Sequence, residues 1–240
     1  MKKNIYIIFL AIICFSCKKK TETPIQEVTT TNNTTNTITP AYGYLGIVKS
    51  QVYSLNTFYS TDTLLYAKFF NTLVYNTDTL INLYSGTVNY NNDSLSANQY
   101  SYTKDLNINS SILNCNWSVT GNSITPVFSH TYTASYPIFT GNNMLPDSFS
   151  ISSNLSLNFS LASNYTNVRV IFEDGTTLID KMFFVGNPSL TISELSTLNG
   201  VNNCNIHLLF SNNHDIIVSG KNYRFSNAIE HIKSGIKVNP

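Results

Sequence analysis

The stretch Asn167-Val-Arg-Val-Ile-Phe-Glu173, followed by Asp174-Gly175 and Thr176–Val185, carries the clearest fold signal in this 240-residue chain. Two runs rich in β-branched and aromatic residues flank Asp-Gly, a dipeptide typical of a two-residue type I′ hairpin turn. The sequence therefore predicts an antiparallel hairpin in which Arg169 lies opposite Asp180 on one face. We interpret that pair as an ordinary cross-strand ion pair rather than a functional site.

Short extended segments separated by turn residues continue on both sides of this hairpin. Composition and alternation predict strands at residues 42–48, 51–55, 64–70, 80–84, 112–119, 127–133, 155–161, 203–211, 215–219, 221–225 and 235–238. Asn212-Asn213 is expected to form a turn, and residues 227–233 a helical turn or a loop.

Residues 188–198 contain the one convincing helix signal. Thr191-Ile-Ser-Glu194 matches a capping box, apolar residues then recur on one face, and Asn199-Gly200 ends the pattern. The fold expected for the whole chain is therefore all-β. We predict two antiparallel β domains, residues 41–134 and 135–240, with the short helix in the second.

Composition excludes some partners. Charged residues make up 11% of the chain, and its formal net charge is +1. Five of its lysines lie within the first 20 residues, so the remainder is net acidic. A nucleic-acid partner would require a basic face, and we predict none.

The first 17 residues have the pattern of an export signal. Met1-Lys2-Lys3 is basic, an apolar run too short for a membrane span follows, and Ser16-Cys17 stands where cleavage would fall. This stretch resembles a bacterial lipoprotein signal, which implies acylation of Cys17, palmitate included, and a stable membrane anchor. Lys18 in place of aspartate favours the cell outer membrane, on its periplasmic or surface side. Residues 18–40, rich in Thr and Asn, are predicted to be a disordered tether.

Three similar units begin at Tyr59, Tyr75 and Tyr90. Each contains Asp-(Ser/Thr)-Leu, and the simplest interpretation is three similar β-turns. The tripeptide also resembles the O-glycosylation sequon of exported Bacteroidota proteins, and that resemblance makes Thr63, Thr79 and Ser94 candidate glycan sites.

Two cysteines remain beyond the leader, Cys115 and Cys204. Export would permit a disulfide between them, and the alternative is two separate buried thiols. Trp117, in phase with Cys115 in its strand, is expected in a core.

Catalytic and metal motifs are lacking. The histidines His130, His207, His214 and His231 show no zincin spacing, and there is no G-x-S-x-G or glycine-rich phosphate loop. His214-Asp215 is expected to face solvent. We predict no cofactor, no metal and no catalytic residues, although dispersed acidic residues leave a glycoside hydrolase as a lesser alternative.

The layout from residue 41 onward resembles small Bacteroidota lipoproteins built of immunoglobulin-like β-sandwiches. The resemblance rests on the anchor cysteine, the Thr/Asn tether, Trp117–Gly121, Asp174-Gly175, the Thr191–Glu194 cap and Gly220–Phe225. It implies a non-catalytic envelope lipoprotein for adhesion, scaffolding or interaction with a protein partner. Carbohydrate binding is the first alternative, and the lesser one is hydrolysis.

Overall fold

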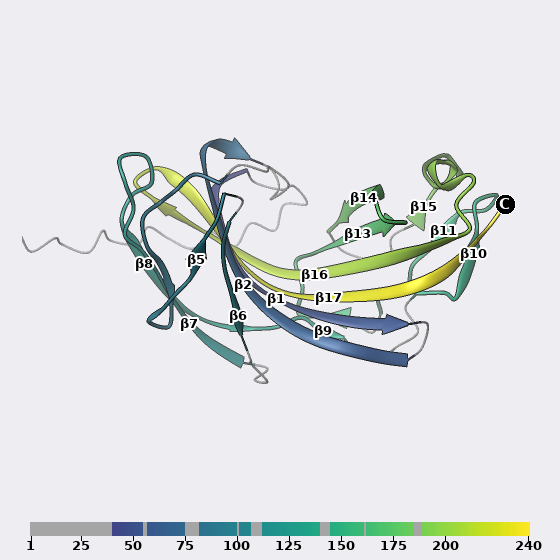
Figure 1. Ribbon diagram of the computed structural model, residues 1–240, viewed down its shortest axis with the longest axis horizontal. Helices are drawn as coiled ribbons and strands as arrows, with labels where there is room; N and C mark the ends of the chain where they lie inside the picture. Colours follow the sequence, from purple (N-terminus) through teal and green to yellow (C-terminus); the bar gives the residue numbers. More distant parts are fainter. Residues whose placement is uncertain are drawn as a thin grey trace, which may run out of the picture.

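The computed structural model describes residues 40–54, 57–74, 82–99, 101–106, 112–139, 145–160, 162–184 and 189–240. Within these residues the chain is nearly all β-strand, with one short helix (Figure 1). The expected all-β class is therefore confirmed. The elements, in chain order, are β1 Ala41–Ser54, β2 Thr57–Val74, β3 Val88–Tyr90, β4 Asp93–Ser94, β5 Ser96–Ala97, β6 Tyr102–Leu106, β7 Ile112–Val119, β8 Phe128–Ser135, β9 Ile138–Phe139, β10 Ser148–Ser150, β11 Leu155–Ser156, β12 Ala162–Ser163, β13 Asn167–Glu173, β14 Thr177–Phe183, β15 Ser189–Leu190, α1 Ile192–Leu195, the 3₁₀ turn η1 Ser196–Leu198, β16 Asn203–Val218 and β17 Lys221–Asn239.

One long, curved sheet runs through the whole molecule, in the order β14-β13-β16-β17-β1-β2-β6-β5, with β10 beside β17. β1 and β17 pair in parallel over twelve residue pairs, and β10 also pairs in parallel with β17. The expectation of purely antiparallel domains is therefore wrong at these two ladders. β1 and β17 lie at opposite ends of the folded chain, so no tight turn forces them to run in opposite directions.

A four-stranded sheet, in the order β4-β3-β7-β8, packs against one end of the long sheet. The hydrophobic cluster between the two sheets is rich in aromatic residues, and we call this end the first lobe. Its buried residues are Leu45, Ile47, Leu65, Ala67, Phe69, Val88, Tyr90, Leu95, Tyr102, Leu113, Cys115, Trp117, Val119, Phe128, Tyr136, Ile216, Val218, Tyr223 and Phe225.

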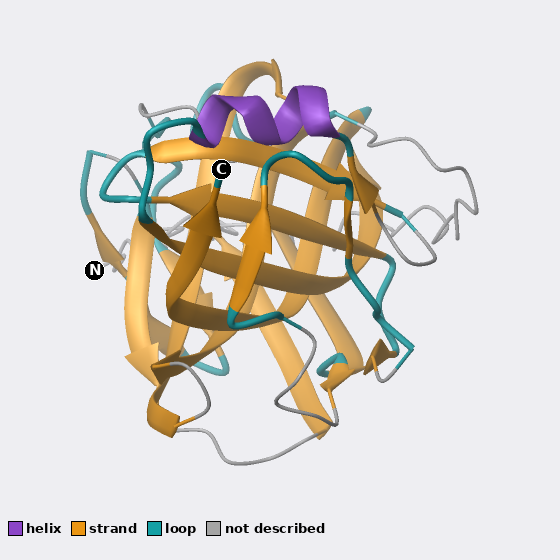
Figure 2. Cartoon of the chain, turned by 90° about the vertical axis from the view of Figure 1, so that its right-hand side faces the viewer, coloured by secondary structure: helices purple, strands orange, loops and turns teal. Residues whose placement is uncertain are grey.

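The other end of the long sheet carries a second hydrophobic cluster, which we call the second lobe. Figure 2 shows the helix lying across the top of this end. Its buried residues are Leu145, Phe149, Leu155, Leu157, Phe159, Val168, Val170, Phe172, Ile179, Leu190, Leu195, Leu198, Cys204, Ile206, Leu208, Phe210, Ile236 and Val238.

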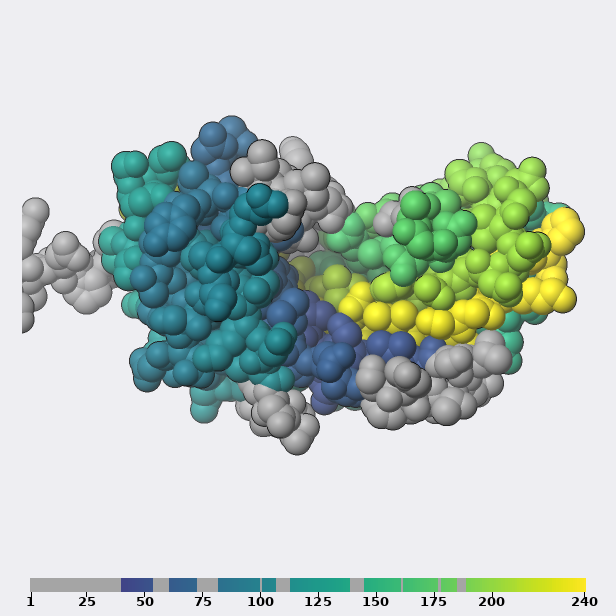
Figure 3. Space-filling model, viewed as in Figure 1, coloured from purple at the N-terminus to yellow at the C-terminus, as the bar shows by residue number. Residues whose placement is uncertain are grey.

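Strands β16 and β17 belong to both lobes. β16 contributes Phe210 to the second lobe and Ile216 to the first. β17 contributes Ile236 to the second lobe and Phe225 to the first. Both strands belong to the segment 135–240, so the two lobes share continuous backbone. In Figure 3 the surface narrows between the lobes, where this shared pair of strands reaches the surface.

The predicted turn at Asn212-Asn213 is wrong, and so is the helical turn or loop at residues 227–233. β16 continues through the first position and β17 through the second, and the chain reverses at Ser219-Gly220, both with positive φ. Asn212, Asn213 and Asn227 lie where the two strands pass from one hydrophobic cluster to the other, a stretch that we call the waist.

The hairpin around Gly175 exists, but its register differs from the prediction. Phe172 pairs with Ile179, and a register shift separates that pair from Glu173 and Thr177. The ladder is displaced by two residues, which keeps every side chain on its predicted face. Arg169 therefore lies diagonally from Asp180 and still reaches it with two hydrogen bonds, one of them 2.8 Å long.

Two other local predictions stand. Thr191 and Glu194 form the capping box, although the α-helix itself covers only Ile192–Leu195 before the 3₁₀ turn. Leu155, Leu157 and Phe159 are buried and alternate with exposed residues, as expected, but only Leu155–Ser156 pairs as a strand.

Candidate binding pocket

A pocket of about 620 Å³ lies between β8 and the waist of β16 and β17. Its lining contains imidazole, amide and hydroxyl groups but no Asp, Glu, Lys or Arg. The lining residues are His130, Thr131, Tyr132, Thr133, Ala134, Ser135, Asn212, His214 and Asn227.

The edges of two sheets form walls of the pocket. Among the described strands, β8 is the last of the four-stranded sheet and pairs only with β7. The ladder between β13 and β16 ends at Asn167 and Ser211. Beyond that point β16 pairs only with β17 among the described residues, so it also forms an edge next to the pocket.

His130 and His214 meet at the inner wall of the pocket, with 2.8 Å between their Nε2 atoms. The His214 ring stacks on Phe225, with centroids 5.2 Å apart and planes 16° apart. Burial, reinforced by the neighbouring His130, lowers the pKa of His214 to about 4. His214 is therefore neutral at neutral pH, and one ring of the pair donates a hydrogen bond to the other.

Two further polar groups border the pocket without a hydrogen-bond partner of good geometry. They are Asn227 Oδ1 and Tyr132 Oη, both buried. Tyr132 lies within side-chain hydrogen-bonding reach of Asn227, and burial raises the pKa of Tyr132 well above its usual value. Buried polar atoms left unpaired are uncommon and call for an explanation. A ligand in the pocket would supply one.

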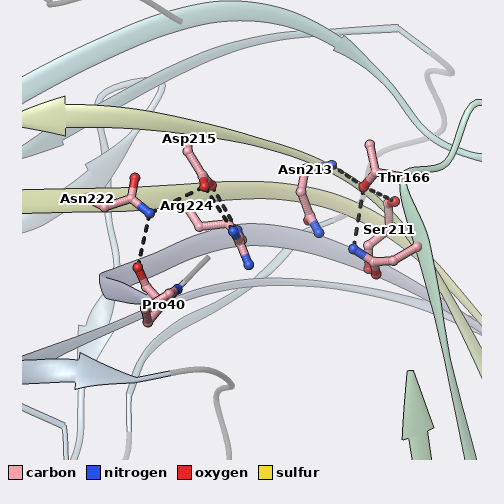
Figure 4. Close-up of polar contacts among 8 residues, drawn as sticks. Pro40, Thr166, Ser211, Asn213, Asp215, Asn222 and Arg224 are labelled. Atoms are coloured by element: carbon pink, nitrogen blue, oxygen red, sulfur yellow. Dashed lines mark hydrogen bonds and ion pairs between the residues drawn. The ribbon is translucent and has the colours of Figure 1, made fainter. Parts of the chain in front are cut away.

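The prediction that His214-Asp215 faces solvent is wrong, because the two side chains lie on opposite faces of β16. Figure 4 shows Asp215 turned toward Arg224 of β17. Arg224 Nε and Nη2 donate to the two carboxylate oxygens at 2.8 and 2.9 Å. Asn222 also donates to the carboxylate, at 3.3 Å, and to the carbonyl of Pro40, at 3.2 Å.

Thr166, which precedes β13, holds the waist of β16 through hydrogen bonds to its backbone. The Thr166 hydroxyl donates to the carbonyl of Ser211 at 3.0 Å and accepts the Asn213 N–H at 3.1 Å (Figure 4). β16 is thereby held straight at the position where the sequence suggested a turn.

A second polar cluster lies on the long sheet, away from the pocket. The two ring nitrogens of His207 contact Glu230 at 2.9 Å and Glu173 at 3.0 Å, and Ser50 donates to Glu230 at 2.6 Å. Burial alone would lower the pKa of His207, but the hydrogen bonds and charges of the two carboxylates raise it. Both ring nitrogens face acceptors, an arrangement that favours the doubly protonated form of His207.

The two candidate disulfide cysteines are free buried thiols in different lobes. The suggested bridge is therefore absent, because separate cores hold the two side chains. Burial raises the pKa of both thiols, that of Cys204 to about 11. Trp117 is fully buried beside Tyr90, as expected of a core residue.

The candidate glycan sites differ in exposure. Thr63 is 7% exposed within β2, and Ser94 is exposed, with its hydroxyl donating to Asn89 at 2.6 Å. Thr79 and Cys17 lie outside the described residues.

Among the described residues, no three His, Cys, Asp or Glu side chains come close enough together to hold a metal ion. The same part of the chain contains no helix with the length and apolar character needed to span a membrane.

Comparison with known proteins adds little. No family model and no curated protein matches the chain. One solved structure that it resembles is described as "Structural insight into host cell surface retention of a 1.5-MDa bacterial ice-binding adhesin". The match has 12% identity, covers 84% of this chain and 66% of that chain, and has a TM-score of 0.20. A likeness of that size supports no argument about function.

Proposed function

We propose that this chain is a non-catalytic lipoprotein of the cell envelope, anchored through Cys17 in the outer membrane. Its folded part, which we infer to be built of immunoglobulin-like β-sandwich units, serves adhesion, scaffolding or interaction with a protein partner. The signal-like first 17 residues and the Thr/Asn segment up to residue 40 support the anchor.

The observation that carries the interaction role is the pocket between β8 and the waist. Asn227 lines a recess of about 620 Å³, is 1% exposed, and makes no hydrogen bond of good geometry through its Oδ1. Burying an unpaired polar group costs about 1–3 kcal/mol, which a bound partner would recover. No carboxylate lines the pocket, so the paired acids of glycoside hydrolysis have no place in it.

Glycan capture is the less favoured alternative. It would use a row of exposed aromatic rings beside amides, and the pocket does offer the amides of Asn212 and Asn227. Among the residues whose side chains the structure describes, however, Tyr84 is the only exposed aromatic residue, and Trp117 is fully buried.

The anchor is tested by growing cells with radiolabelled palmitate. The label should enter the protein and be lost in Cys17→Ser. Labelling of the variant, or no labelling of the natural chain, would contradict the anchor.

The interaction role is tested by photo-crosslinking in intact cells. A benzoylphenylalanine at Thr133, an exposed residue of the pocket lining, should give a discrete adduct. The matched control is Ser129, exposed on the same strand but outside the pocket. Equal yields at both positions, or no adduct at Thr133, would contradict an interaction site here.

A further inference from the structure

Two neighbouring loops of the first lobe expose large apolar side chains. Tyr84 is 66% exposed, Val127 53% and Ile124 39%. The loops are joined because the Asn122 side chain donates a hydrogen bond to the Tyr84 carbonyl. Exposed apolar groups that gather in one place mark interaction surfaces, whereas single scattered ones need no explanation.

The turn between β16 and β17 lies beside these loops and adds a cation. The Lys221 ammonium donates to the Ile124 carbonyl and lies 5.1 Å from the centroid of the Tyr42 ring. The next residue, Asn222, donates to the Pro40 carbonyl at 3.2 Å, directly before β1 (Figure 4). Direct contacts therefore join the apolar loops to the turn and to the first residues that the structure describes.

We call this group the tip patch, and its members are Tyr84, Ile124, Val127 and Lys221. No Asp or Glu occurs in the loops and the turn that carry it, residues 84–87, 120–127 and 217–222. The patch thus combines an aromatic ring, aliphatic side chains and a cation without a negative charge. Tyrosine favours the headgroup level of a membrane, aliphatic groups favour the boundary with the acyl chains, and lysine is attracted to anionic headgroups.

The tip patch lies at the end of the molecule to which the proposed lipid anchor leads. Cys17 precedes Pro40 by 23 positions, and a flexible chain of that length spans about 25 Å on average. A short flexible linker produces an effective concentration on the order of millimolar. Contacts too weak to hold a free protein at a bilayer are therefore sufficient to orient an anchored one.

We propose that the tip patch docks on the phospholipid bilayer that holds the anchor. The apolar side chains enter the interface, and Lys221 lies among anionic headgroups. This inference rests on the proposed anchor through Cys17 and specifies how the folded part meets the membrane. The second lobe, at the other end of the sixteen-residue strand β16, then points away from the bilayer. A folded protein partner is disfavoured because a standard interface uses about 20–30 residues a side, far more than this patch contains.

The test uses the full-length lipidated protein in vesicles of phosphatidylethanolamine and phosphatidylglycerol, with and without bromine on the acyl chains. Bromine quenches tryptophan fluorescence only at close range. Val127→Trp places a reporter in the tip patch, and Ile192→Trp places one at a 49% exposed position of α1 in the second lobe. The natural Trp117 is fully buried and gives the same background in both proteins.

Brominated lipid should quench the added fluorescence of Val127→Trp at least about twofold and that of Ile192→Trp by less than about a tenth, because only the first ring meets acyl chains. Ile124→Asp in the Val127→Trp background should remove most of this quenching, since a carboxylate is costly to bury in hydrocarbon. Ile138→Asp, at an exposed isoleucine outside the patch, should leave it unchanged. Equal midpoints of urea unfolding confirm that the variants are folded.

Flotation with the vesicles measures the anchor separately. Equal quenching of the two reporters, or no quenching of Val127→Trp in protein that floats, would overturn the docking and leave the anchor standing. Shielding of the Val127→Trp ring that grows with protein concentration and is independent of bromine would assign the patch to a second copy and also overturn the docking. Protein that does not float would contradict the anchor and the docking together.

Discussion

His207 and His214 lie seven residues apart on the same strand, and their pKa values are shifted in opposite directions. The carboxylates of Glu173 and Glu230 flank the ring of His207 and raise its pKa. The ring of His214 lies against Phe225 and His130, and burial, reinforced by His130, lowers its pKa to about 4. His207 belongs to a charged polar network on the long sheet, whereas His214 is a neutral side chain at the edge of the aromatic core of the first lobe.

The comparison shows that adjacent residues in the sequence are poor guides to charge in a sheet. His214 is followed by Asp215, but that carboxylate points to the opposite face and is held by Arg224. His207 follows Ile206 directly, and both of its acidic partners come from other strands. Alternation of side chains across a strand makes cross-strand neighbours decisive.

The largest effect is expected from Phe225→Ala, which removes the ring under His214. Truncating a buried phenylalanine costs about 3–5 kcal/mol, so the midpoint of urea unfolding should fall accordingly. Water reaching His214 should raise its pKa toward about 6.5, as measured by NMR titration. Phe210→Ala in the second lobe is the control: it should cost a similar amount and leave the pKa of His214 unchanged.

Asp215→Asn should cost about 3 kcal/mol of unfolding free energy, because Arg224 is left largely buried without its carboxylate. The pKa of His214 should fall only slightly, since the charge of Asp215 now raises it weakly. The more exposed pair of Arg169 and Asp180 provides the control, and Asp180→Asn should cost under about 1 kcal/mol. Equal costs would contradict the difference in burial.

His214 should make the protein acid-sensitive. The unfolded chain takes up a proton at this residue near pH 6.5, whereas the folded chain resists until about pH 4. Stability is therefore lost as the pH falls through that window, by on the order of 2–3 kcal/mol. In His214→Gln, the decrease in unfolding free energy between pH 6.5 and pH 4, measured by urea unfolding, should be smaller by that amount. Parallel pH curves for the two proteins would contradict this assignment.

His207 should respond to pH in the opposite direction, with a smaller effect. Its raised folded pKa contributes stability that is complete below about pH 6.5 and is lost as the pH rises through the folded value. Glu230→Gln should therefore cost about 1–2 kcal/mol at pH 6 and less at pH 9, as measured by urea unfolding. Glu173→Gln, at a more exposed position, should cost less. A cost that grows with pH would exclude an imidazolium.

Local signals predicted local structure well. The capping box, the Gly175 hairpin and strand Ile112–Val119 were visible because short-range backbone and turn preferences determine them. The hairpin register was missed by two residues, because the bulge at Leu178 of β14 changes the loop while leaving that side chain half-buried.

The pocket was not predictable in the same way. Its walls combine β8 with Asn212, His214 and Asn227, and nothing in the sequence around these residues indicates that they meet β8. The polar run around Asn212 looked like a turn because a strand that passes between two cores loses its apolar alternation there. A signal was still present, since the alternation resumes in phase at Ile216.

The parallel pairing of β1 and β17 has a mechanical consequence. Twelve residue pairs join these strands, from Gly43 with Tyr223 to Ser54 with Ser234. Tension applied between the start of β1 and the end of β17 would load these hydrogen bonds together, in shear, rather than peel them apart one by one. If a membrane were attached before β1 and a load after β17, the force between them would therefore act along the direction in which the sheet resists extension most strongly.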